Sequence, residues 1–92
     1  MPLARGHISA YGKVQGVFFR SSVRDKAQTL DIRGWVRNCS DGSVEAVFEG
    51  EKDAIEKMVQ WCTKGPAGAV VEKVDVQWED YQDEFDIFSI VY

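Results

Sequence analysis

The strongest constraint on the fold is the order in which helical and strand-like periods follow one another along the 92 residues. In two segments, apolar side chains recur every three or four residues, which indicates amphipathic helices that each bury one face. The first set is Phe19, Val23, Ala27 and Leu30, and the second is Ile55, Met58, Val59 and Cys62. Gly65-Pro66 follows the second set and is a typical helix end. We therefore expect two helices, separated and flanked by strands.

Around these helices, apolar and polar residues alternate, as they do in strands that bury one face. The alternating segments are residues 7–12, 32–37, 44–49, 70–79 and 88–92. Asp41-Gly42 separates the second segment from the third and is a strong hairpin signal. The resulting order, β-α-β-β-α-β with a short final edge strand, predicts an α+β fold of the ferredoxin-like α/β sandwich type. In that fold an antiparallel sheet is covered on one face by two helices.

Length and charge narrow the class of protein. A chain of 92 residues that is 45% hydrophobic predicts a single domain over residues 1–92. The net charge of −4 disfavours nucleic acid as a partner, because duplex binders rely on a basic face. No apolar run could span a bilayer, and the first residues do not resemble a secretory signal. These features predict a soluble cytoplasmic protein that does not bind membranes.

Few residues suit a metal site or a histidine-based catalytic site. Cys39 and Cys62 lack the CxxC spacing, and His7 is the only histidine, so we expect reduced thiols, no metal and no cofactor. His7 is expected at the beginning of the first strand, at the far end of the sheet from the residues described next. The acidic run over residues 79–86 is expected to be solvated surface.

The segment between the first strand and the first helix is a candidate anion site. Glycines at 12 and 16 allow the backbone to curl, so that its N–H groups converge at the mouth of a helix. Arg20 falls in the first helical turn, where its planar guanidinium can donate two parallel hydrogen bonds to a phosphate. The alternative is that this glycine-bearing segment is an ordinary connection.

Asn38 is a second candidate, at the end of the second strand. Its amide both donates and accepts hydrogen bonds, which suits a group that orients a water molecule. The alternative is an asparagine that bonds its own backbone at a strand end. A right-handed crossover through the first helix predicts that the first two strands run parallel. Their carboxyl ends, and with them Arg20 and Asn38, would then face one ligand.

Two separated motifs contain these candidates. The first is Gly12-Lys13-Val14-Gln15-Gly16-Val17-Phe18-Phe19-Arg20, and the second runs from Gly34-Trp35 through Asn38 to Gly42 and Val44, with Gly50 beyond. Together they resemble the two signatures of the acylphosphatase family, the first of which is a glycine, any residue, Val-Gln-Gly-Val, any residue, and Phe-Arg. The resemblance extends over nearly the whole chain, including Lys64-Gly65-Pro66 and the terminal segment that ends in Tyr92.

This resemblance implies a metal-free hydrolase of acyl phosphates, which are small molecules, and a monomeric protein without a cofactor. It implies that Arg20 binds the phosphate and that Asn38 positions the attacking water. It also implies that the loop residues donate backbone N–H groups to the phosphate: Gln15, Gly16, Val17, Phe18 and Phe19. Because the leaving carboxylate is the base of an acid with a pKa of about 4 to 5, no general acid is required. We therefore predict selectivity for anhydrides over phosphate monoesters.

Other functions remain compatible with the order of elements. The same fold serves RNA-recognition modules and small regulatory or metal-carrying domains. A non-catalytic domain that only binds an anion is a further alternative, as is a module specialised for carbamoyl phosphate of the kind found at the start of hydrogenase-maturation proteins. Activity toward carbamoyl, acetyl and benzoyl phosphate would separate the last alternative from a general acylphosphatase.

Overall fold

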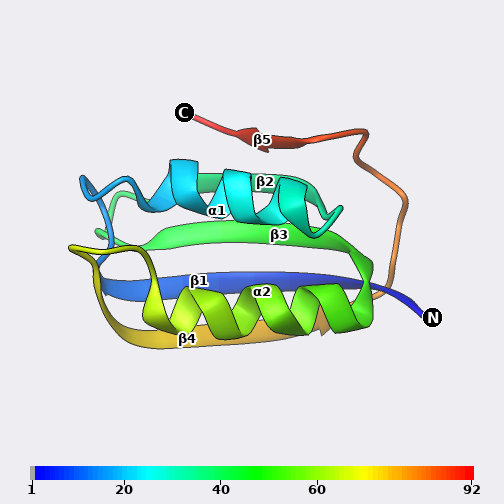
Figure 1. Cartoon of the computed structure of the whole chain (residues 1–92), viewed down its shortest axis with the longest axis horizontal. Helices are drawn as coiled ribbons and strands as arrows, with labels where there is room; N and C mark the ends of the chain where they lie inside the picture. The colour runs from blue at the N-terminus through cyan, green and yellow to red at the C-terminus, as the bar shows by residue number, and fades with distance from the viewer. Residues whose placement is uncertain (1) are drawn as a thin grey trace.

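The computed structural model describes residues 2–92, and its elements follow the predicted order. The elements are β1 (Leu3–Lys13), α1 (Phe19–Thr29), β2 (Arg33–Asn38), β3 (Val44–Glu51), α2 (Lys52–Lys64), β4 (Val70–Glu79) and β5 (Phe88–Ile90). Both helices lie on one face of the sheet (Figure 1). Helix α2 packs mainly on β4 and β1, and α1 packs on β2 and β5. The predicted ferredoxin-like α/β sandwich is confirmed.

The topology brings two distant segments to one end of the sheet. The strand order is β4-β1-β3-β2-β5. Because β3 pairs antiparallel with both β1 and β2, these two strands run in the same direction, as predicted, with β3 between them. The β1–α1 loop (residues 14–18) and the β2–β3 turn (residues 39–43) therefore lie at the same end of the sheet (Figure 1).

The sheet is mixed at one edge. It is antiparallel from β4 to β2, as predicted, but β5 pairs in parallel with β2. Residues 80–87 carry the chain from β4 across the opposite end of the sheet to the far edge, so β5 enters beside β2 from the end where β2 begins (Figure 1). The last residues of the chain are thereby returned toward the end of the sheet that holds the β1–α1 loop.

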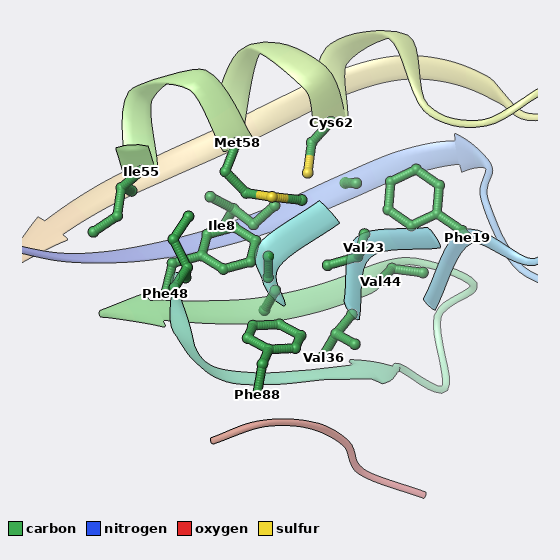
Figure 2. Close-up of a cluster of buried hydrophobic side chains, with 14 of the residues drawn as sticks. Ile8, Phe19, Val23, Val36, Val44, Phe48, Ile55, Met58, Cys62 and Phe88 are labelled. Carbon is green, nitrogen blue, oxygen red and sulfur yellow. The ribbon is translucent and has the colours of Figure 1, made fainter. Parts of the chain in front are cut away.

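The core fills the space between the helices and the sheet (Figure 2). Ile55, Met58 and Cys62 of α2 point toward the sheet, where Ile8 and Phe48 meet them. The periodicity predicted these positions, and the side chains are buried because each apolar residue of this size gains about 1.5–3 kcal/mol on leaving water.

Gly34 lets β2 approach β3 closely. Its φ is 144°, and a Cβ atom there would lie 1.8 Å from the carbonyl oxygen of Val47. Any larger residue would have to push the two strands apart, which would also displace the carboxyl end of β2. The glycine of the second signature therefore sets the position of the strand that carries Asn38.

Candidate active site

A cavity of about 320 Å³ lies where the β1–α1 loop meets the end of β2. Its walls come from the loop, the first turn of α1, the last residue of β2, and β5 with the residues after it. The lining residues are Val14, Gly16, Phe18, Phe19, Arg20, Ser21, Asn38, Ile90 and Tyr92. Segments from the beginning, middle and end of the chain therefore form one cavity.

The β1–α1 loop turns sharply into the helix through two left-handed residues. Gly16 has a φ of 74°, and Phe18 has a φ of 60° and a ψ of 25°. This conformation costs a non-glycine residue roughly 1–2 kcal/mol. The carbonyl oxygen of Phe18 accepts hydrogen bonds from the Ser22 N–H at 3.0 Å and the Ser21 hydroxyl at 3.1 Å, which hold the turn in place.

The N-terminus of α1 is open to an anion. No side chain caps it, and its first turn contains no acidic residue. The first N–H groups of a helix have no partner within the helix and carry the positive end of its dipole. Because this end of α1 lies at the cavity wall, its N–H groups are available to a negatively charged ligand.

Arg20 is the second residue of α1 and contributes the positive charge of the cavity. The aromatic ring of Tyr92 lies against its guanidinium, with 4.9 Å between Cζ and the ring centroid. Within residues 2–92, no carboxylate forms an ion pair with Arg20, and no acceptor takes a hydrogen bond from it. The N–H groups of this guanidinium therefore have no partner among the described residues and are available to a ligand.

Asn38 is the last residue of β2, and its exposed side chain lines the same cavity. Its backbone pairs with Val44 across the hairpin. Within the described residues, the side-chain amide of Asn38 makes no hydrogen bond. The turn after it is well fixed, because Asp41 accepts hydrogen bonds from the Ser43 hydroxyl at 2.6 Å and the Ser43 N–H at 2.9 Å. These hydrogen bonds lower the pKa of Asp41, which keeps it ionised.

Gln15 links the β1–α1 loop to the β2–β3 turn. Its side-chain amide donates to the carbonyl oxygens of Cys39 at 2.8 Å and Ser43 at 2.9 Å. The side chain therefore does not line the cavity, and neither does Val17, which packs against the core. The other sequence candidates meet at the cavity: Gly16, Phe18, Phe19, Arg20 and Asn38.

Sequence analysis missed the roles of Ser21, Ile90 and Tyr92 in the cavity wall. Ser21 directly follows the first signature, and proximity to Arg20 was a usable signal. Ile90 and Tyr92 offered no local signal, because their position depends on where β5 joins the sheet. The one indication for Ile90 and Tyr92 was that the family resemblance includes the terminal segment of the chain.

His7 does not line this cavity, but the prediction that it lies at the beginning of its strand, at the far end of the sheet, is wrong. Strand β1 begins at Leu3, so His7 is the fifth residue of the strand and pairs with Val47 and Gln77 on either side. Its ring contacts the carboxylate of Glu45 and lines a separate cavity on the helix-free face. The acidic run lies away from the Arg20 cavity, and two of its carboxylates, those of Glu79 and Glu84, pair with Arg5.

Comparison with known proteins identifies the family. The model of the acylphosphatase family matches residues 6–90. This chain belongs to the acylphosphatase family. A relative from Pelotomaculum thermopropionicum named acylphosphatase is 51% identical over 92 residues, which are all of this chain and all of the relative. The structure of an acylphosphatase from Coxiella burnetii superimposes with a TM-score of 0.92 at 40% identity, over 97% of this chain and 93% of that chain.

The acylphosphatase fold also occurs within a longer protein. Full-length HypF, in a phosphate- and nucleotide-bound form, matches 99% of this chain with a TM-score of 0.86 and 26% identity, but the match covers 12% of HypF. The match covers all of the Pelotomaculum thermopropionicum relative and 93% of the Coxiella burnetii chain, but only 12% of HypF. The findings therefore support an acylphosphatase and do not favour a specialised module or a non-catalytic domain.

The helices of this acylphosphatase are short. In residues 2–92, neither is both long and apolar enough to cross a membrane.

Proposed function

We propose that the cavity binds the phosphate group of an acyl phosphate, and that Arg20 and Asn38 have different roles in its hydrolysis. The observation that carries the proposal is that both polar side chains face one cavity at an uncapped helix N-terminus. Arg20 donates two parallel hydrogen bonds to phosphate oxygens. The backbone N–H groups of residues 15–19 donate the others, because a curled loop before a helix directs them inward.

Asn38 holds the attacking water. Its amide oxygen accepts a hydrogen bond from the water and leaves an oxygen lone pair directed at phosphorus. As the new P–O bond forms, the bond between phosphorus and the acyl oxygen breaks, and its electron pair leaves with the carboxylate. The water's protons pass to solvent and to the phosphate, so the products are a carboxylate and inorganic phosphate. Catalysis by positioning and charge stabilisation is sufficient for phosphoryl transfer of this kind.

The reaction needs no general acid. Carboxylic acids have a pKa of about 4 to 5, so the leaving group departs as a stable anion at neutral pH. A phosphate monoester instead releases a strongly basic alkoxide, which normally requires an acid or a metal. We therefore infer a metal-free reaction that is selective for the anhydride.

Hydrolysis of benzoyl phosphate by purified wild type, Arg20→Ala and Asn38→Ala tests these roles, with a chelator present and a phosphate monoester as a control substrate. Matched control variants are Arg24→Ala and Gln28→Ala, which change α1 residues outside the cavity. Inhibition by inorganic phosphate reports binding separately from turnover.

We expect Arg20→Ala to lose both phosphate inhibition and turnover, because the anion loses its charge partner. We expect Asn38→Ala to keep phosphate inhibition while kcat falls by about 100-fold or more, since the water alone loses its position. Comparable loss of both properties in Asn38→Ala would contradict the separate roles. Turnover that disappears with chelator would contradict the metal-free mechanism.

We also infer that residues 1–92 act as one domain, as a cytoplasmic monomer. The cavity draws its residues from the beginning, middle and end of one chain, which supports a site that is complete in each copy. Light scattering after size-exclusion chromatography measures the mass directly. A dimer of about twice the 10.4 kDa chain mass would contradict the monomer.

A further inference from the structure

Two aromatic side chains stand exposed at the rim of the cavity. Phe18 is 82% exposed and Tyr92 is 96% exposed, and both line the space beside Arg20 together with the half-buried Ile90. Large apolar side chains that gather at a ligand cavity are unlike single exposed ones scattered over a surface. The phosphate cradle uses only polar groups, so the function proposed above assigns neither ring a contact with the substrate.

The aromatic ring at position 18 is not required by the loop. Phe18 has a left-handed backbone, which glycine adopts without strain and a bulky residue does not. Position 18 is also the undefined position of the first signature, between Val17 and Phe19. A strained, exposed aromatic residue beside a reacting group is therefore better explained by a ligand contact than by folding.

Tyr92 is positioned by β5, which pairs with β2. The N–H of Val91 donates to the carbonyl oxygen of Val36 at 2.9 Å, which continues the pairing of β5 with β2. The ring then lies against the guanidinium of Arg20. An apolar surface is thereby held next to the group that binds phosphate, where the acyl part of a bound substrate has to lie.

The charge of the cavity restricts the acyl group. Among the described residues that line it, Arg20 is the only one with a charged side chain. An acyl group with an ammonium group would meet the like charge of the guanidinium and no side-chain carboxylate, and one with a second carboxylate would compete with the phosphate for the guanidinium. An uncharged, apolar acyl group meets neither difficulty and can contact the two rings.

We propose that Phe18, Ile90 and Tyr92 form an acyl-group subsite that selects apolar, and especially aromatic, acyl phosphates. This inference rests on the proposed function, because it assumes that phosphate binds at Arg20. The subsite raises kcat/KM for an aromatic acyl phosphate relative to acetyl phosphate. Differences of one or a few methylene groups in such pockets typically change kcat/KM by about 10-fold or more.

The test compares benzoyl phosphate with acetyl phosphate in wild type, Phe18→Gly, Tyr92→Ala and Ile87→Ala. Glycine at 18 suits the left-handed backbone, so this variant is expected to fold. Ile87 is a large exposed residue outside the cavity and serves as the matched control. The measured quantity is the ratio of kcat/KM for the two substrates, which cancels losses that affect both substrates equally.

We expect the benzoyl-to-acetyl ratio to fall about 10-fold in Phe18→Gly and in Tyr92→Ala and to stay at the wild-type value in Ile87→Ala. Equal losses with both substrates would overturn the subsite, while continued hydrolysis would leave the proposed function intact. If the wild type hydrolysed neither substrate, the proposed function itself would be wrong.

Binding of unreactive probes tests the subsite independently of turnover. Benzylphosphonate and methylphosphonate share the anionic head and differ in the ring. Calorimetry should show that wild type binds benzylphosphonate about 10-fold more tightly, and that this preference is lost in Phe18→Gly. Equal affinity of wild type for the two phosphonates would overturn the proposal.

Discussion

The side-chain amide of Gln15 lies 2.8 Å from the carbonyl oxygen of Cys39 and donates a hydrogen bond to it. A second hydrogen bond from the same amide reaches the carbonyl oxygen of Ser43 at 2.9 Å. Cys39 and Ser43 are the ends of the β2–β3 turn and are themselves joined by a backbone hydrogen bond of 2.8 Å. One side chain of the β1–α1 loop therefore fixes the turn that follows Asn38.

Replacing Gln15 should impair turnover more than phosphate binding. In Gln15→Ala each of the two carbonyl oxygens loses one donor and keeps a backbone donor, the Gly42 N–H for Cys39 and the Cys39 N–H for Ser43. We expect a cost of about 1 kcal/mol of stability and a less firmly held end of β2. We expect kcat for benzoyl phosphate to fall about 10-fold or more, because a small misplacement of the water is sufficient. Phosphate inhibition should change less, since Arg20 is retained. Gln28→Ala is the control, and a drop in stability with unchanged kcat would mean that Gln15 serves the fold alone.

Lysine should not replace Arg20. Arg20→Lys keeps the positive charge but loses the planar pair of donors and the stacking on Tyr92. We expect kcat/KM for benzoyl phosphate to fall by about 100-fold, as when one strong donor to a transition-state oxygen is removed. Arg24→Lys on the same helix should leave kcat/KM unchanged. Near-normal activity of Arg20→Lys would show that charge alone is sufficient.

Glu49 should make folding stability depend on pH. Burial of the Glu49 carboxylate by itself favours a higher pKa. Hydrogen bonds from the backbone N–H groups of Gln82 and Glu84 and the charge of Arg5 outweigh burial, so the pKa of Glu49 lies below its ordinary value of 4.5. A lowered folded-state pKa stabilises the fold above about pH 4.5, and this contribution is lost as the pH falls through the lowered value.

Chemical unfolding measures this contribution. At pH 7, we expect Glu49→Gln to reduce the free energy of unfolding by about 2 kcal/mol, because a charged acceptor is lost. At pH 3 the difference between wild type and Glu49→Gln should be smaller, since protonation weakens the same contacts in wild type. A difference that is the same at pH 7 and pH 3 would contradict this role of the carboxylate.

The two thiols should differ in reactivity. Burial raises the pKa of Cys62 to about 12, while Cys39 is only partly buried. At pH 8 about one Cys62 thiol in ten thousand would be ionised, and the thiolate is the reactive form. A thiol reagent should therefore modify one cysteine in the native wild type, none rapidly in Cys39→Ser, and two after unfolding. Rapid reaction of native Cys39→Ser would refute the burial of Cys62.

Local sequence was sufficient for much of the fold and for the two central site residues. The helical positions Val23 and Met58 and the strand position Val36 are buried where their periods predicted, since burial of one face is a local property of an element. Family signatures pointed to Arg20 and Asn38, and these line one cavity. Their assigned roles stay predictions until the variants are measured.

The helix-free face shows where local patterns fail. Alternation over residues 44–49 separates Glu45, Val47 and Glu49 from the apolar set Val44, Ala46 and Phe48, and nothing in this pattern indicates a buried glutamate. Glu49 is instead 1% exposed, because the segment after β4 folds over it and donates two backbone N–H groups. No local pattern around residue 49 contains that information.

By itself, the sequence determined the order of elements, the buried face of each and the pair of residues around which a phosphate site could form. Only the tertiary structure decided that β3 lies between β1 and β2, that β5 joins β2 in parallel, and that Tyr92 consequently rests on Arg20. The physical reason is separation along the chain. Periodicity reports how neighbouring side chains divide between core and solvent, whereas strand pairing and side-chain contacts such as that of Gln15 depend on segments that meet only after folding.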